Sequence, residues 1–157
     1  MNADEHLIEH MMNPQNYGNL PDNNAMGMGK NPNNGEKVAI YLKVIEKEEA
    51  PFIEDINFQA IGCTTTIVAG SIITSEAKGI TFRRAEELIS ITIGMLDNVP
   101  PEDAACTEMV ALALKAAIDT YAERQKDPAF PVISYHINTD CTPKEKNIEK
   151  NIEEEKK

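Results

Sequence analysis

The strongest periodic pattern in the chain is an alternation of apolar and polar residues in its first third. Apolar side chains occupy every second position from Val38 to Val44. A period of two predicts a β-strand with one buried face. A second alternation places Ile56, Phe58 and Ala60 on one side, and a charged turn over residues 46–51 separates the two runs. We therefore expect an antiparallel β-hairpin.

A different period governs the later part of the chain. From Thr107 to Tyr121 the apolar residues follow the i, i+3, i+4, i+7 spacing of an amphipathic helix over about four turns. Residues 65–78 are rich in Ala, Ser, Thr and Ile, which predicts a helix packed closely on the sheet, with Gly79 as its stop. Thr81 is placed to cap a further short helix. Residues 91–96 could begin another element.

The remaining segments carry weaker patterns. Residues 4–12 have helical spacing that ends at Asn13-Pro14, because the residue before a proline is disfavoured in a helix. Residues 13–35 are rich in Asn, Pro and Gly, which predicts loops with at most one short edge strand. We expect one domain over 1–126, an irregular extension over 127–143 that contains three prolines, and a charged, disordered tail over 144–157.

Composition narrows the class of protein. A chain of 157 residues with 41% hydrophobic residues can bury a core without disulfides. Three cysteines and the absence of a basic and apolar leader predict a reducing, cytoplasmic location. No apolar run approaches the ~18 residues that cross a bilayer, so we expect no membrane insertion. The net charge of −11 disfavours nucleic acid and suits either a solvated surface or a basic protein partner.

Two cysteines are the candidate chemical groups. Cys63 follows the second predicted strand, and Cys106 precedes the predicted long helix. A thiol near a helix N-terminus is stabilised as the thiolate, the form that binds metal or attacks sulfur. Free cysteines are also often small buried hydrophobic residues, and the residues leave both readings open.

Other possible ligands have less support. Cys141 lies 35 positions beyond Cys106, in the segment expected to be irregular. His6 and His10 have a spacing of four that can bind metal on a helix, although such pairs are more often surface residues. His136 has no motif around it.

Several segments, taken in order, resemble one known family. Asn13-Pro14-Gln15-Asn16-Tyr17-Gly18, Phe58-Gln59-Ala60-Ile61-Gly62-Cys63 and Lys115-Ala116-Ala117-Ile118-Asp119-Thr120-Tyr121 are similar to segments of the IscU family, also called NifU-N-like, on whose members iron–sulfur clusters are assembled. The resemblance implies an α+β fold with a small antiparallel sheet of about three strands and helices on one face. It also implies an assembly scaffold and not an enzyme.

The resemblance assigns the site residues. Cys63 and Cys106 occupy the second and third cysteine positions of the family, whereas Asn34 stands at the first, Glu36 replaces an aspartate, and Ala105 stands where a histidine is common. We therefore expect Cys63 and Cys106 to share one metal centre at one end of the molecule. Two thiolates fall short of the four ligands that a cluster takes, so a [2Fe–2S] cluster shared by a homodimer is chemically feasible.

The resemblance also implies partners. A cysteine desulfurase would donate sulfur, with Cys106 as the accepting thiol. Residues 98–103 lie where the family carries Leu-Pro-Pro-Val-Lys, which its Hsp70-type chaperone reads; Asp103 reverses the charge of the lysine, which argues against that chaperone. Two alternatives stay open: an adaptor that binds the desulfurase or another scaffold without assembling clusters, and a simple metal-binding protein with zinc on Cys63, Cys106 and Glu36.

Overall fold

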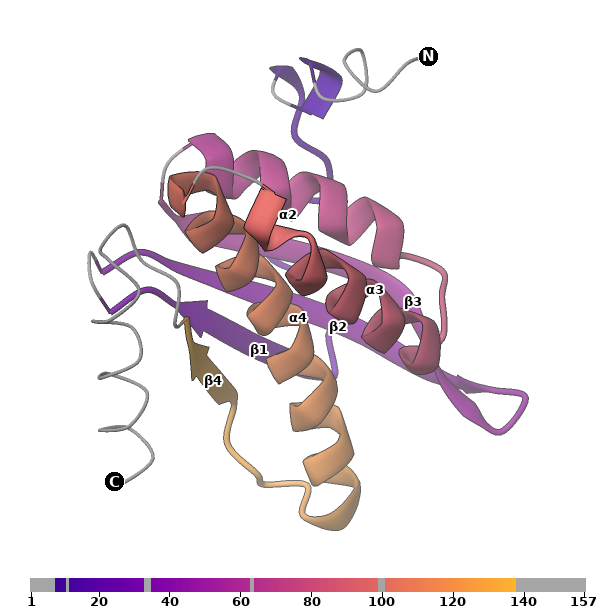
Figure 1. Ribbon diagram of the computed structural model, residues 1–157. Coiled ribbons are helices and arrows are strands. Elements are labelled where there is room, and N and C mark those ends of the chain that lie inside the picture. Colours follow the sequence, from indigo (N-terminus) through magenta and orange to yellow (C-terminus); the bar gives the residue numbers. More distant parts are fainter. Residues whose placement is uncertain (1–7, 11, 33–34, 63, 99–100, 138–157) are drawn as a thin grey trace.

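The computed structural model describes residues 8–10, 12–32, 35–62, 64–98 and 101–137. They form an α+β fold with two layers, one of strands and one of helices. Four strands form a sheet in the order β3-β2-β1-β4, and the helices α2, α3 and α4 cover one of its faces (Figure 1). The elements are β1 (Ala25–Lys30), β2 (Lys37–Lys47), β3 (Ala50–Ile61), α2 (Thr64–Ala77), α3 (Phe82–Gly94), a 3-10 turn η1 (Leu96–Asn98), α4 (Pro101–Lys126) and β4 (Ile133–His136).

The predicted hairpin is confirmed as β2 and β3. Ile40 pairs with Phe58 and Leu42 with Ile56, and all four side chains are completely buried against the helices. A β-bulge interrupts the register after Lys43. Glu48 and Glu49 close the hairpin with positive φ angles of 54° and 66°, which explains why a turn without glycine can join the strands so tightly.

β1 is the short strand that the Asn- and Gly-rich segment allowed, but it is not an edge strand. β1 pairs with β2 on one side and with β4 on the other. Its glycines let α4 approach the backbone: a Cβ on Gly27 would lie 2.0 Å from the Ala117 nitrogen, and one on Gly29 would lie 2.0 Å from the Met109 oxygen. β1 and α4 therefore pack backbone against backbone, which only glycine permits here.

β4 departs from the expected irregular extension and makes a fourth strand, where we expected about three. It pairs parallel with β1, from Gly27 opposite Ile133 to Lys30 opposite His136. Contacts with α4 hold it in place: the Ile133 N–H donates to Thr120 Oγ1 at 3.0 Å, and Tyr135 Oη donates to Asp119. Such contacts join distant parts of the sequence and leave no local periodic pattern.

The helices also extend beyond their predicted limits. α3 begins after the Thr81 cap, as expected, but runs on to Gly94 where the sequence suggested a separate element. α4 begins at Pro101, six residues before the first periodic position. Proline is favourable at the first position of a helix because its missing N–H would have no partner there. In the described part of the chain, no helix combines the length and apolar character that crossing a bilayer requires.

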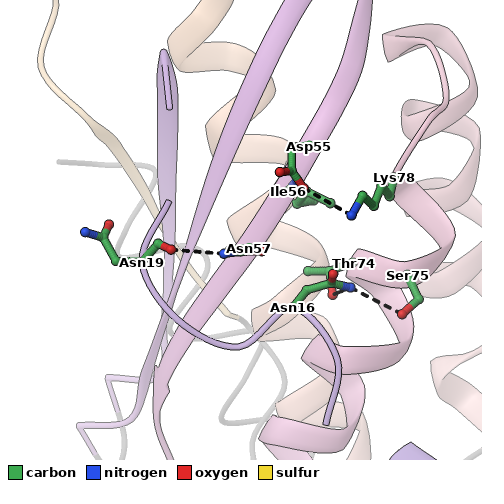
Figure 2. A network of polar contacts seen from close by, with 8 residues as sticks. All are labelled: Asn16, Asn19, Asp55, Ile56, Asn57, Thr74, Ser75 and Lys78. Atoms are coloured by element: carbon green, nitrogen blue, oxygen red, sulfur yellow. Dashed lines mark hydrogen bonds and ion pairs between the residues drawn. The ribbon is translucent and has the colours of Figure 1, made fainter. Parts of the chain in front are cut away.

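Residues 16–18 cover the outer edge of β3. Gly18 N donates to the Phe58 oxygen at 2.8 Å, and Phe58 N donates to the Asn16 oxygen at 2.9 Å. Figure 2 shows the side chains of this region: Asn16 reaches Thr74 and Ser75 of α2, at 3.1 and 3.3 Å. Asn16 adopts a left-handed φ of 63°, a conformation that Asn tolerates. The Asn13–Gly18 motif thus has a structural role in closing the sheet edge.

Two tyrosines on α4 and β4 should make the fold sensitive to alkali. Burial and a hydrogen bond to Glu46 raise the pKa of Tyr121 to about 12; burial and a hydrogen bond to Asp119 do the same for Tyr135. A folded-state pKa above the unfolded value of 10 contributes stability that is complete below pH 10 and is lost as the pH rises toward 12.

Chemical denaturation at a series of pH values should therefore show a falling free energy of unfolding between pH 10 and pH 12. Tyr121→Phe and Tyr135→Phe should each flatten that slope. Tyr41→Phe, which removes the donor of a hydrogen bond to the neutral Gln59 amide, is the control. A slope that persists in the double variant of Tyr121 and Tyr135 would assign the alkaline loss to other groups.

Candidate metal centre

Two of the connections that carry predicted ligands leave the sheet at the same end. Lys30, Lys37 and Ile61 lie side by side across β1, β2 and β3. The β1–β2 loop over residues 31–36 and the turn between β3 and α2 therefore leave the sheet at the same end. These two connections carry Asn34, Glu36 and Cys63, of which Asn34 and Cys63 lie outside the described residues.

The β1–β2 loop is closed by its own backbone. Asn31 N donates to the Glu36 oxygen at 2.9 Å, and Gly35 N donates to the Asn31 oxygen at 3.0 Å. Gly35 has a φ of 77°, which an L-residue adopts only with strain. Backbone hydrogen bonds thus hold the two ends of the loop, on either side of position 34.

Glu36 lies directly beside the turn that precedes Cys63. A Cβ built on Gly62 would be 3.3 Å from Glu36 Oε2 and 3.0 Å from Thr66 Oγ1. The Glu36 carboxylate is therefore close to the neighbour of Cys63 and to the first turn of α2. This placement agrees with the role expected for Glu36, although a carboxylate is a harder ligand than the thiolate that iron–sulfur clusters prefer.

Cys106 lies in the second turn of α4 and not ahead of it, which corrects the sequence-based expectation. Its side chain is buried, with only 7% of the residue exposed. The effect of the helix dipole is confined largely to the first turn, so the dipole argument for a thiolate does not hold at this position. The early start of α4 at Pro101 is the cause.

The packing of α4 on β1 nevertheless brings Cys106 to the same end. Along β1, Gly27 touches Ala117 and Gly29 touches Met109, so α4 runs antiparallel to β1. Cys106 is one turn before Met109 and therefore lies beyond Gly29, toward Asn31 and its loop. The shared metal centre of Cys63 and Cys106 stays a prediction, since Cys63 is not described.

Three buried polar residues near this end were not recognised in the sequence. Asn31 is 6% exposed, Thr66 is completely buried and Glu108 is 9% exposed. Asn31 opens the β1–β2 loop, Thr66 lies in the first turn of α2, and Glu108 follows Cys106 by two residues. Polar residues in a loop or at a helix start are usually solvated, so their burial becomes evident only from the packing of the helices and the loop on the sheet.

The other candidate ligands lie apart or are not described. His10 Nδ1 contacts Ser71 Oγ of α2 at 2.6 Å, and His136 is exposed on β4 opposite Lys30. His6 and Cys141 lie outside the described residues. Among the residues that are described, no group of three His, Cys, Asp or Glu could hold a metal ion. Of the cysteines that were predicted as ligands, Cys106 is the one that lies within the described residues.

Comparison with known proteins gives a consistent picture. The profile of the NifU-like N-terminal domain family matches residues 2–128. The iron–sulfur cluster assembly scaffold protein IscU 1 of Archaeoglobus fulgidus is 34% identical over 116 residues, which are 73% of this chain and 73% of that protein. IscU of Aquifex aeolicus is 33% identical over 122 residues, 77% of this chain and 76% of its own length. IscU of Escherichia coli K12 is 29% identical over 125 residues, 78% and 95% of the two chains.

Solved structures show the same fold at lower sequence identity. A putative scaffold protein for the SUF system from Fervidobacterium islandicum AW-1 superposes with a TM-score of 0.60 at 15% identity, covering 73% of this chain and 94% of that one. The N-terminal part of a NifU-like protein from Brucella abortus gives a TM-score of 0.61 at 14% identity, covering 76% and 94%. These two likenesses establish the architecture and nothing finer.

Proposed function

Because the chain belongs to the NifU-like N-terminal domain family, we propose that it is a cytoplasmic scaffold on which iron–sulfur clusters are assembled, and not an enzyme. The match of that family over residues 2–128 is the observation that carries the proposal. The convergence of Glu36, the Gly62 turn and Cys106 at one end of the sheet supports it.

The chemistry begins with sulfur transfer from a cysteine desulfurase. The Cys106 thiolate attacks the terminal sulfur of the desulfurase persulfide, a new S–S bond forms on Cys106, and the electron pair of the broken S–S bond leaves with the desulfurase thiolate. Conversion of that sulfur to sulfide takes two electrons, which a thiol or an electron carrier must supply. Cys106 is nearly covered by the fold, so docking of the desulfurase has to expose it.

The cluster is cargo for which this chain has an incomplete ligand set. We assign Cys63 and Cys106 as its thiolate ligands and Glu36 as a weaker third, with a neutral Asn34 at the missing cysteine. Iron–sulfur clusters take four ligands, mostly thiolates. Two chains together provide four thiolates, so we propose a [2Fe–2S] cluster shared by a homodimer.

β4 makes Cys141 the alternative thiol to examine. Ile137 N donates to the Lys30 oxygen at 3.0 Å, which brings the chain to the ligand end of the sheet as it leaves β4. The four residues that follow Ile137, the last of which is Cys141, span at most about 14 Å when extended. A third thiolate from the same chain is therefore sterically feasible.

Anaerobic reconstitution with ferrous iron, L-cysteine, a reductant and a cysteine desulfurase tests the scaffold function. A visible charge-transfer absorption with iron and sulfide in equal amounts is expected from the unmodified chain. Cys106→Ser should lose most of it. Cys106→Ala, which keeps the small buried volume without an oxygen, separates a folding defect from loss of the ligand when both melting curves are recorded.

The burial of Cys106 and the presence of Asn34 favour one second candidate, an adaptor that binds the desulfurase without building a cluster. In that case the desulfurase would bind equally well to the unmodified chain and to Cys106→Ala, and reconstitution would give no visible absorption. Zinc in equimolar amount in protein purified without added metal, lost in both Cys63→Ser and Glu36→Gln, would instead indicate a simple metal-binding protein.

A further inference from the structure

The face of the sheet opposite the helices is open, and its charge differs from that of the whole chain. Cross-strand neighbours share a face, so the register places Lys30 and Lys37 together on this open face, next to Ile61 of β3 and His136 of β4. The chain as a whole has 26 acidic and 15 basic residues. A row of basic side chains is therefore a local exception.

Lys30 and Lys37 stand directly opposite each other in an antiparallel pair. Like charges in that position destabilise a sheet. The salt bridges of the described part of the chain use other lysines, namely Lys78, Lys115 and Lys126. Farther along the same face, Lys43 is opposite Asp55 and so has a nearby acidic neighbour. The uncompensated positive charge is thus confined to the row at one end of the open face.

A hollow with a volume of about 370 Å³ adjoins this row. Its lining joins Lys37 to apolar and aromatic side chains, including the flexible Met26 and Met28. Ile61 and Tyr17, which also line it, are 62% and 49% exposed. Methionine side chains adapt to different occupants, and an apolar hollow beside fixed charge is the usual form of a site that receives an anchoring side chain.

We propose that this surface, defined by Lys30, Lys37, Ile61 and the Met26–Met28 hollow, docks an acidic protein segment that inserts an apolar side chain into the hollow. Charge complementarity selects the occupant: carboxylates would compensate the lysine pair, which no described residue does by a salt bridge. A second copy of this chain docking through the same face would set lysines against lysines. The inference depends on the sheet face alone and not on whether a cluster is assembled.

A peptide probe tests the surface directly. The chain contains no tryptophan, so the peptide Glu-Glu-Trp-Glu-Glu provides the only indole fluorescence in a titration with the full-length protein. We expect saturable binding that weakens as salt is added, because exposed charge pairs are screened. The double variant Lys30→Glu/Lys37→Glu should weaken binding by about tenfold or more, and Ile61→Ser should weaken it by a smaller factor.

Two controls separate docking from structure. Lys43→Glu changes the same charge on the same face outside the row and should alter affinity by less than about twofold. Lys37→Glu alone places opposite charges across β1 and β2, so it should raise the melting temperature while lowering peptide affinity. A purely structural role for the pair would not produce those opposite effects.

Four results would overturn the proposal. Affinity for the acidic peptide that is unchanged in Lys30→Glu/Lys37→Glu would remove the row from the site. Equal binding of Lys-Lys-Trp-Lys-Lys would show that the hollow does not discriminate charge. An iron-free dimer in sedimentation that dissociates in the double variant, or a tenfold gain in peptide affinity after deletion of residues 138–157, would identify a second copy or the C-terminal segment as the occupant.

Discussion

Cluster assembly on the unmodified chain should double its mass in solution from 17.4 kDa. Each chain brings two thiolates to the proposed site, and four are needed. A ligand that only the dimer can hold stabilises the dimer by mass action. Light scattering on anaerobic samples should therefore show dimer appearing with the visible absorption, and chelation of iron should return the protein to monomer.

Two variants make this expectation specific. Cys106→Ser leaves one thiolate per chain at the site and should abolish both the absorption and the dimer. Cys141→Ser leaves the bridging ligands intact and should change neither. A clustered monomer that loses its cluster in Cys141→Ser would contradict the shared cluster and would identify the residue after β4 as the third thiolate of a single chain.

Asn34→Cys should lengthen the lifetime of the cluster by about tenfold or more. Loss of an outer-shell hydrogen bond typically weakens metal binding about 10- to 100-fold, and a new thiolate in direct contact with iron should have at least that effect. The loop that carries position 34 is closed by the Asn31–Glu36 and Gly35–Asn31 hydrogen bonds, so the substitution need not disturb the sheet. Decay of the visible absorption in the presence of a chelator measures the lifetime.

The matched control is Asn33→Cys, which adds the same thiol one position earlier in the same loop. Only Asn34→Cys should prolong the lifetime and allow a monomer to retain the cluster. Equal lifetimes for the two variants and the unmodified chain, with unchanged melting curves, would show that position 34 does not face the cluster.

The sequence predicted the elements whose packing leaves a local periodic pattern. β2 and β3 alternate because one face is buried, and residues 107–121 of α4 have the i, i+3, i+4, i+7 spacing of apolar residues. β1 gives almost no pattern, because Gly27 and Gly29 replace the apolar residues that would mark its buried face. The sequence pattern did not predict β4 for another reason. Its four residues are held by hydrogen bonds to β1 and α4, and β1 lies far away in the sequence.

The location of the site stays a prediction, because Cys63 and Asn34 lie outside the described residues. The place of each cysteine before a predicted helix and the family resemblance indicated one end of the molecule. The strand register and the packing of α4 bring Glu36 and Cys106 to the same end of the sheet. Burial of Cys106 was one of the two readings that the residues left open, and the early start of α4 at Pro101 is what places its side chain in the core. Glu108 was missed because nothing local distinguishes a buried glutamate from a solvated one.

The close contact between β1 and α4 implies that the ligands of the proposed site differ in how far they can move. An added Cβ at Gly27 or Gly29 would collide with the backbone of α4, so β1 and α4 are packed as closely as their backbones allow. Cys106 is therefore expected to be the stationary ligand, because it is carried on the helix that packs directly on the sheet, and Glu36 is expected to be the ligand that yields first. Release of a finished cluster to an acceptor should accordingly begin at Glu36 in the β1–β2 loop, and the bond to Cys106 should be the last protein bond to break.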